Sequence, residues 1–246
     1  MNKIKYNTRI TDSRFNKIFS KKIKFSKNLI KYSDEKLLDS YDHNSFSNNK
    51  DVTLKELYDA IKYQKDNNFN YLKIITYNKL KKEYINKLNL EENEVVTMLY
   101  KGNSDKLKIN DKVVIKPISL KDLNYIEIKH YEIDCGEWFC KRRNKRYLNK
   151  SHSNKNFIYY GAYINNKIVG TCHSFSYKGY TCIDSLLVDN YHRHKHIAST
   201  LLKNIICTHK NVYLHADKNE KEFNYYKKLG FVVIDKYYDY YKKIEL

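Results

Sequence analysis

The chain has 246 residues, enough for one large or two small domains with a buried core. Its formal net charge of +19 favours anionic partners, but lysine is spread along the whole chain, so a dedicated nucleic-acid-binding role is not favoured. Five irregularly spaced cysteines argue against a disulfide framework, and no apolar run is long enough for a signal peptide or a membrane span. We therefore expect a cytoplasmic protein.

The apolar pattern before residue 101 predicts a small α/β domain. Leu54, Leu57 and Ile61 repeat at near-helical spacing after candidate caps at Asp51 or Thr53. The expected elements are short strands at 23–25 and 29–32, a polar loop at 39–44, helices at 53–64 and 80–88, and strands at 71–75 and 95–100. The polar stretch 101–105 is the clearest break, so the sequence predicts an N-terminal domain at 1–110 and a second domain at 111–246.

The second domain has a clearer alternation of apolar residues and turns. The expected elements are a strand at 113–115, a helical segment around Trp138, strands at 157–164, 168–177 and 180–188, a loop at 189–195, a helix at 197–206, a strand at 212–216, a helix at 220–229, and strands at 231–234 and 237–244. The first three long strands form a meander, and the helical crossover makes strands 180–188 and 212–216 parallel.

These elements predict an α/β fold with a mixed, mostly antiparallel central sheet flanked by helices, preceded by the smaller α/β N-terminal domain. The helix–strand–helix–strand order of residues 53–100 repeats that of residues 198–234. The N-terminal domain is therefore either a degenerate copy of the same fold or an ordinary α/β alternation.

A basic loop leads from the third meander strand into an amphipathic helix. The first turn of such a helix presents unpaired backbone N–H groups and the positive end of the helix dipole. Arg193 and Lys195 add full charges in the preceding loop. The pattern therefore predicts an anion site suited to a pyrophosphate, without specifying which anion.

The same loop resembles the acyl-CoA loop of the GNAT superfamily of N-acyltransferases, with the core pattern Gln/Arg-x-x-Gly-x-Gly/Ala. Arg193 and Ala198 match the ends of this pattern, whereas His196 replaces the central glycine, which lets the backbone approach the phosphates. Asn219 and Tyr226, followed by Leu229-Gly-Phe, resemble the family segment Asn…Phe/Leu-Tyr-x-x-Leu-Gly-Phe. The spacing of seven predicts that Asn219 and Tyr226 share a helix face.

The resemblance implies an acyl-CoA-dependent enzyme with acetyl-CoA as co-substrate. Arg193 would open the loop, and Asn219 would contact the cofactor arm. Backbone groups for the pantetheine arm would come from Leu186, Leu187 and Val188. The N–H groups that cradle the pyrophosphate would come from His194, Lys195, His196, Ile197, Ala198 and Ser199.

The implied reaction is direct attack of a primary amine on the acetyl carbonyl in a ternary complex. A base must accept the amine proton, and an acid must protonate the CoA thiolate. Tyr226 is the candidate acid, because a phenol is a donor at neutral pH. Asp184 is the candidate base, and alternation places it on the same strand face as Cys182 and Leu186; the alternative is a structural carboxylate.

Two other functions stay open: a non-catalytic acyl-CoA-binding or regulatory module and, less favoured, a basic RNA- or ribosome-associated protein. We expect no metal site, because His192, His194 and His196 alternate on a single loop and no Cys-x-x-Cys is present. The expected partner is an amine acceptor, either a small molecule or a peptide or protein amine. We expect a monomer or homodimer with no membrane association.

Overall fold

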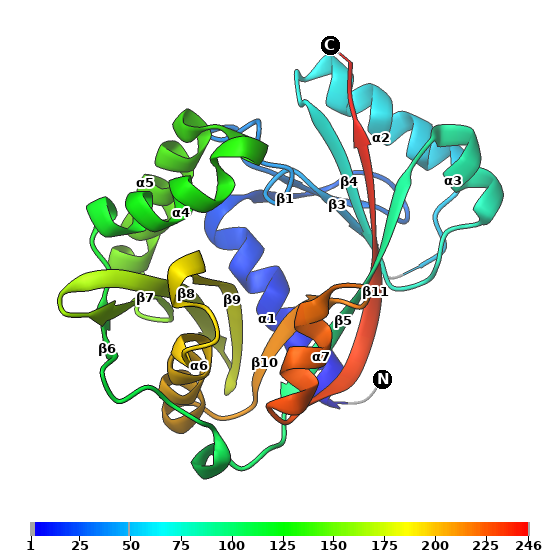
Figure 1. Cartoon of the computed structure of the whole chain (residues 1–246). Helices are drawn as coiled ribbons and strands as arrows, with labels where there is room; N and C mark the ends of the chain where they lie inside the picture. Colours follow the sequence, from blue (N-terminus) through cyan, green and yellow to red (C-terminus); the bar gives the residue numbers. More distant parts are fainter. Residues whose placement is uncertain (1–2, 49, 246) are drawn as a thin grey trace. The chain divides into compact units, whose positions relative to one another are not determined.

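The computed structural model describes residues 3–48 and 50–245 as alternating helices and strands (Figure 1). In chain order the elements are α1 (Lys3–Phe19), β1 (Lys21–Lys24), β2 (Ile30–Ser33), β3 (Phe46–Asn48), α2 (Leu54–Asp66), β4 (Tyr71–Thr76), α3 (Lys82–Leu88), β5 (Glu91–Tyr100), η1 (Ser104–Lys106), β6 (Val114–Pro117), α4 (Leu120–Cys135), α5 (Glu137–Ser153), β7 (Phe157–Ile164), β8 (Lys167–Tyr177), β9 (Tyr180–Val188), η2 (Asn190–His192), α6 (Ile197–Thr208), β10 (Val212–Asp217), α7 (Lys221–Lys228) and β11 (Phe231–Lys243). Within the described residues, none of these helices combines the length and apolar character needed to cross a bilayer.

Two compact units make up the chain, and neither is one stretch of sequence. The first unit contains the residues up to Asp12, Met98–His215 and Asn224–Ile234. The second contains Ser13–Thr97, Ala216–Phe223 and the residues from Asp235 onward. These two units differ from the two domains predicted on either side of residues 110 and 111, because each unit contains residues from both halves of the chain.

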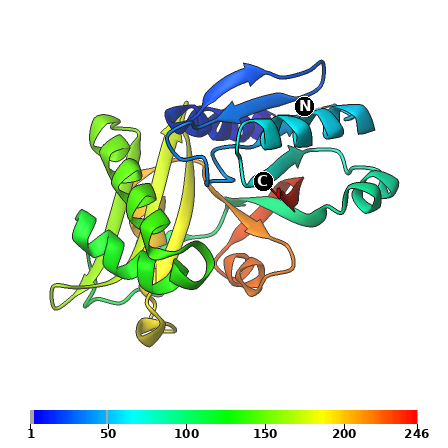
Figure 2. The ribbon, with the colours of Figure 1, turned by 90° about the horizontal axis from the view of Figure 1, so that it is seen from above.

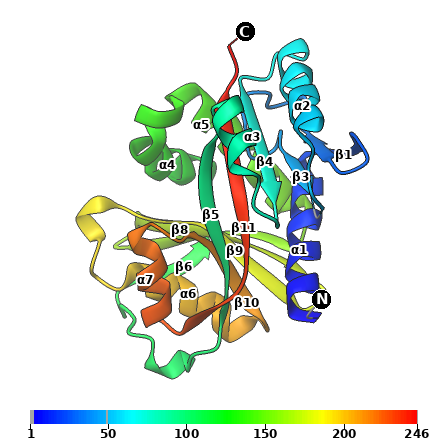
Figure 3. The same cartoon turned by 90° about the vertical axis from the view of Figure 1, so that its right-hand side faces the viewer.

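The first unit is built on a mixed, mostly antiparallel sheet. Its strands follow the order β11-β5-β10-β9-β8-β7-β6, with β6 to β9 antiparallel and β10 parallel to β9. Strands β5 and β11 are shared between the units, and only the end of β5 from Met98 and the start of β11 up to Ile234 belong to the first. Helices α4 and α5 pack against β8 and β7 on one face, and α6 packs against β7, β8 and β9 on the other (Figures 1 and 3). This arrangement confirms the predicted fold class of the C-terminal half.

Helix α6 lies close to the sheet because its apolar side is continuous and the strand beneath it has a glycine. Ile197, Leu201, Leu202 and Ile205 are all buried. A Cβ at Gly170 would lie 3.0 Å from a methyl carbon of Ile197, so the absence of a side chain there permits the close packing. The start of α6 is thereby held against β8.

A β-bulge interrupts β9 at Ser185, whose φ is +52°. On β8, His173 pairs with Asp184, and Thr171 pairs with Leu187, so β9 contains one extra residue. Leu187 therefore shares the sheet face of Asp184. The expectation that Leu186 shares this face is wrong, because simple alternation does not survive a bulge.

Several elements differ from the sequence predictions. Helices α1 and α4 were not predicted, because their few buried apolar residues are interspersed with polar ones and do not stand out as a helical stripe. The two strands expected at 231–234 and 237–244 form the single strand β11. Gly136, with φ +76°, separates α4 from α5.

The second unit has strand order β1-β2-β3-β4-β11-β5. Strands β3 and β4 are parallel and joined by α2, and the β1–β2 hairpin and α2 can be followed in blue and cyan in Figure 2. Apolar side chains from α2, from these strands and from β11 form its core, including Phe46, Leu57, Leu72, Ile74 and Tyr240.

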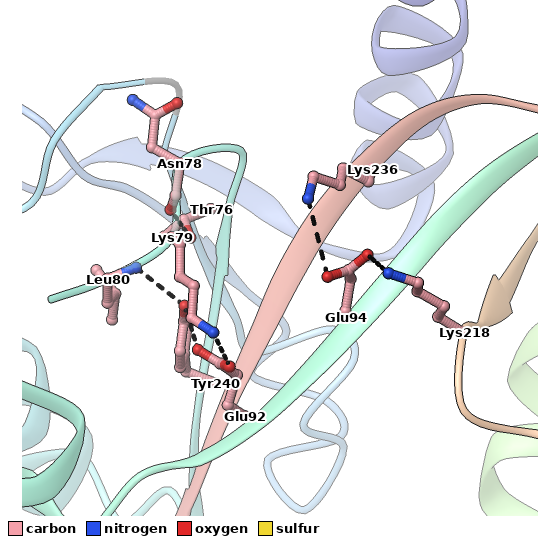
Figure 4. A network of polar contacts seen from close by, with 9 residues as sticks. All are labelled: Thr76, Asn78, Lys79, Leu80, Glu92, Glu94, Lys218, Lys236 and Tyr240. Atoms are coloured by element: carbon pink, nitrogen blue, oxygen red, sulfur yellow. Dashed lines mark hydrogen bonds and ion pairs between the residues drawn. The ribbon is translucent and has the colours of Figure 1, made fainter. Parts of the chain in front are cut away.

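Acidic side chains on β5 connect its neighbours in the second unit (Figure 4). Glu92 accepts a hydrogen bond from the Tyr240 hydroxyl at 3.0 Å and pairs with Lys79 at 2.7 Å. Glu94 pairs with Lys218 at 2.7 Å and with Lys236 at 3.8 Å. These contacts hold β11 and the segment after β10 to β5.

Candidate acyl-CoA site

The loop between β9 and α6 is held at both ends by contacts within the first unit. At its start, Asp189 pairs with Lys129 of α4 at 2.6 Å and with His192 at 2.8 Å. Hydrogen bonding to Lys129 and His192 outweighs the opposing effect of burial and lowers the pKa of Asp189, so its carboxylate stays charged. At its end, the Asn110 amide donates to the Lys195 carbonyl at 2.9 Å. The loop is therefore preorganised.

Two histidines give the loop its path. His194 and His196 have φ values of +61° and +58°, in the left-handed region that glycine adopts at least cost. Histidine is one of the residues more tolerant of this region, which explains how His196 can stand where the GNAT pattern has glycine. The side chains of both histidines are exposed.

The start of α6 presents backbone donors without a side-chain cap. His196 is the N-cap residue and makes no side-chain capping hydrogen bond. The N–H groups of Ile197, Ala198 and Ser199 precede the first intrahelical bond, which runs from Thr200 N to the His196 carbonyl at 3.0 Å. Together with the exposed Arg193 and Lys195, these groups form a positively polarised helix start suited to phosphate oxygens.

Contacts that sequence reasoning missed fix the first turn of α6. The Ser199 hydroxyl donates to the Lys108 carbonyl, and the Asn110 N–H donates to the Thr200 hydroxyl at 3.0 Å. Tyr225 of α7 also hydrogen-bonds to Ser199, although burial has the larger effect and raises the Tyr225 pKa. The Asn110 and Lys108 contacts span about 90 positions of sequence, so no local pattern signals them.

The far end of β9 offers an open backbone edge on the side of β10. The pairs described between these strands end at Leu214 opposite Ile183, one residue before Asp184. Beyond that point Leu186, Leu187 and Val188 continue in β9, and β8 pairs with the opposite edge. An amide-bearing chain such as pantetheine can add hydrogen bonds along an edge of this kind.

Asp184, the candidate base, is exposed and lies next to a buried polar network. It is opposite His173 on β8, and its Oδ1 accepts the Ser185 N–H at 2.6 Å. His173 packs against Phe157 and Tyr159, with ring centroids 5.2 and 5.1 Å away. Burial lowers the pKa of His173 to about 4, so its imidazole is neutral at physiological pH.

The network beneath Asp184 contains a charge pair. Glu127 of α4 accepts hydrogen bonds from Tyr159 at 2.7 Å and from Arg143 of α5 at 2.6 Å. Glu127 is only 2% exposed, so this pair is withdrawn from solvent. It fixes α4 and α5 against β7, whereas the Asp184 carboxylate is exposed.

The two residues of the C-terminal motif lie in different local structures. Helix α7 begins at Lys221, so Asn219 lies in the preceding turn, and the expectation that it shares a helix face with Tyr226 does not hold. Asn219 belongs to the second unit and Tyr226 to the first. Tyr226 is half-buried, with its ring 5.8 Å from that of Phe231.

The loop histidines do not converge on one point. His192 contacts Asp189, and His194 and His196 are exposed. Within residues 3–48 and 50–245, the group of side chains close enough to hold a metal ion is instead Asp12, Cys182 and His215. No sequence pattern links these three residues, because they are brought together from three separate elements.

Comparisons with known proteins bear on the fold of the chain. Residues 155–233 match the family model described as an acetyltransferase (GNAT) domain. The chain is similar to a functionally unknown conserved protein from Staphylococcus epidermidis, with TM-score 0.77 and 17% identity over 93% of this chain and 96% of that one. It is also similar to a GCN5-related N-acetyltransferase from Kribbella flavida, with TM-score 0.61 and 10% identity over 95% and 94% of the two chains.

A third similar structure is a tandem GNAT protein from the clavulanic acid biosynthesis pathway, with TM-score 0.55 and 8% identity over 89% of this chain and 79% of that one. Among curated proteins no sequence matches the chain. At these identities the structural likeness establishes the fold alone.

Residues 155–233 match the acetyltransferase (GNAT) domain model, and the sheet order of the C-terminal half agrees with that match. The C-terminal half has the GNAT fold of acyl-CoA N-acyltransferases. The α/β N-terminal half fits a GNAT-like domain, as in the tandem structure.

Proposed function

We propose that this protein transfers an acetyl group from acetyl-CoA to a primary amine by direct attack in a ternary complex. The observation that carries the proposal is the uncapped start of α6, where left-handed His194 and His196 turn the loop and three backbone N–H groups are available. Arg193 and Lys195 supply the charge that a pyrophosphate requires.

The pantetheine arm would lie along the open edge of β9 at Leu186, Leu187 and Val188. This position would bring the thioester to the bulge at Ser185, beside Asp184. Asn219 is retained as a proposed contact of the cofactor arm on the strength of the sequence motif alone.

In the proposed reaction the unprotonated amine attacks the acetyl carbonyl, and Asp184 accepts the amine proton directly or through water. The tetrahedral intermediate collapses, the carbon–sulfur bond breaks, and Tyr226 protonates the departing CoA thiolate. Proton transfer by each of these groups would contribute roughly 10²- to 10⁴-fold to the rate.

Calorimetry and a thiol-release assay test binding and catalysis separately. We expect acetyl-CoA to bind the wild-type protein and a panel of amines to release free CoA thiol. The double variant Arg193→Ala, His196→Glu should lose binding, whereas Lys210→Ala, a matched exposed charge at the other end of α6, should retain it. Binding without thiol release from any amine would support the non-catalytic acyl-CoA module instead.

The two adjacent tyrosines of α7 allow the proposed acid to be identified. We expect Tyr226→Phe to lower kcat by about 100-fold with little change in the Kd for acetyl-CoA, because only the proton donor is removed. Tyr225→Phe should affect cofactor binding more than kcat, because Tyr225 contacts Ser199 at the start of α6. If the two variants exchange these effects in steady-state kinetics, the acid is Tyr225.

A further inference from the structure

A cluster of three metal-ligating side chains lies in the first unit, away from the start of α6. Asp12 of α1, Cys182 of β9 and His215 of β10 place a carboxylate oxygen, a thiol sulfur and an imidazole nitrogen within 4.8 Å of one another. His215 Nε2 is 3.3 Å from Asp12 Oδ1. All three residues are half-buried.

The fold explains why these residues converge. Parallel pairing places Tyr213 opposite Cys182, and His215 follows two residues later on the same face of the sheet. Helix α1 brings Asp12 to this face, where the Tyr213 hydroxyl donates to Asp12 Oδ1 at 2.6 Å. The Tyr213 ring also packs edge-on against His215, with centroids 5.6 Å apart. Tyr213 is fully buried, so it holds both Asp12 and His215 in place.

We propose that Asp12, Cys182 and His215 form a zinc site that joins helix α1 to strands β9 and β10. A thiolate, an imidazole and a carboxylate are the three ligand types that zinc takes in proteins, and softer thiolate ligation disfavours magnesium and calcium. Tetrahedral zinc places ligand atoms about 3.2–3.8 Å apart, so only small side-chain movements separate this cluster from coordination. Water would complete the fourth position.

The Tyr213 hydroxyl would orient the Asp12 carboxylate without itself contacting the metal. Ligating carboxylates in metal sites are themselves hydrogen-bonded, and such partners orient the ligand. Zinc binds cysteine as the thiolate, so binding at this site would release a proton to the buffer.

The alternative is a hydrogen-bonded cluster with no affinity for metal, since Asp12 already contacts both Tyr213 and His215. Metal titration of the full chain, stripped with a chelator, distinguishes the two. We expect one equivalent of zinc per chain by elemental analysis, a rise in Tm on adding zinc, and a thiolate-to-cobalt charge-transfer band when cobalt(II) replaces zinc.

Variants assign the ligands. Cys182→Ser should abolish the charge-transfer band. His215→Gln and Asp12→Asn should each weaken zinc binding by at least about tenfold, because loss of a group that only hydrogen-bonds to a metal ligand already weakens binding by about that factor. The matched controls Cys207→Ser and His152→Gln remove an exposed thiol and an exposed imidazole elsewhere in the unit and should bind like wild type.

Circular dichroism of each variant shows whether it is folded, and His215→Gln provides a second test if Cys182→Ser does not fold. The proposal is overturned if the wild-type chain takes up no zinc in this titration. It is equally overturned if the cobalt band persists in folded Cys182→Ser or if His215→Gln binds zinc like wild type.

Discussion

His196 holds a backbone conformation that a side chain makes costly. A left-handed φ costs a non-glycine residue about 1–2 kcal/mol, and His196 lies at +58° at the start of α6. Its imidazole is exposed, so its own contacts do little to offset this cost. The loop therefore keeps the path that the GNAT pattern assigns to glycine, at some expense in stability.

We expect His196→Gly to raise the free energy of unfolding by about 0.5–1 kcal/mol, after allowance for the greater freedom of glycine in the unfolded chain. His196→Val should lower it by at least about 1 kcal/mol, because a β-branched residue tolerates this region poorly. Urea unfolding measures both. In calorimetry, His196→Gly should bind acetyl-CoA at least as tightly as wild type. A tenfold loss would show that the imidazole itself contacts the phosphates.

Lys31 is a fully buried lysine whose Nζ donates to uncharged acceptors. Its Nζ donates to Gln64 Oε1 at 2.7 Å and to the Asn44 carbonyl at 3.0 Å. The rings of Phe46 and Phe69 lie 4.6 and 4.5 Å away. Burial lowers the Lys31 pKa to about 7.

The sign of the resulting pH dependence follows from proton counting. Between pH 7 and about 10 the unfolded chain keeps the Lys31 proton and the folded chain loses it, so stability rises with pH. Relative to Lys31→Met, the wild-type free energy of unfolding should increase by about 1.4 kcal/mol per pH unit between pH 7.5 and 9.5. Parallel urea titrations of the two proteins measure this difference. Equal slopes would mean that Lys31 stays charged in the folded protein.

At the scale of elements, the order β3-α2-β4-α3-β5 repeats the order β9-α6-β10-α7-β11. Strands β3 and β4 are parallel across α2, as β9 and β10 are across α6. Beside each parallel pair the next strand comes from the other half of the chain, with β11 next to β4 and β5 next to β10. This exchange explains why both units draw on both halves.

The two equivalent helices differ at their first turn. Helix α2 has a capping box, in which the Glu56 carboxylate accepts hydrogen bonds from Thr53 N at 3.0 Å, Ser26 Oγ at 2.6 Å and Asn28 N at 3.1 Å. Burial by itself would raise the Glu56 pKa, but hydrogen bonds from Ser26, Thr53 and Asn28 outweigh burial and lower this pKa to about 2. The Glu56 carboxylate therefore occupies the start of α2, whereas the start of α6 has no side-chain cap.

We accordingly expect calorimetry to give one equivalent of acetyl-CoA per chain. The double variant Arg193→Ala, His196→Glu should remove all acetyl-CoA binding, because the Glu56 carboxylate already occupies the start of α2 and leaves no second phosphate site there. Residual binding at full affinity in that variant would place a site in the second unit. Glu56→Gln should lower the free energy of unfolding by about 1–2 kcal/mol without adding a second equivalent.

At the scale of the whole molecule, the formal charge of +19 acts on every polyanionic ligand. Coenzyme A has several phosphate charges, and long-range attraction to exposed lysines is screened within about 8 Å at physiological ionic strength. We expect the Kd for acetyl-CoA to increase steadily from 50 to 500 mM salt. Acetyl-pantetheine, which lacks the phosphates, provides the matched control and should show little salt dependence; equal dependence would contradict the assignment of the loop to phosphates.

Local patterns were sufficient for much of the C-terminal half. The meander β7–β9, the loop and α6 follow from alternation, turn residues and apolar spacing over short distances, and the loop motif identified the region that the family model matches. Helix α4 escaped prediction because few of its residues are buried, and β11 was expected as two strands because its burial pattern is irregular.

By itself the sequence determined the periodicity of these elements and the chemistry of the basic loop, because both depend on neighbouring residues. Only the tertiary structure decided the bulge at Ser185, the anchoring of Lys195 by Asn110 and the meeting of Asp12 with Cys182 and His215. The bulge depends on pairing with β8, and the other contacts join segments tens to hundreds of residues apart. Such contacts arise from the packing of the whole chain, which no local pattern encodes.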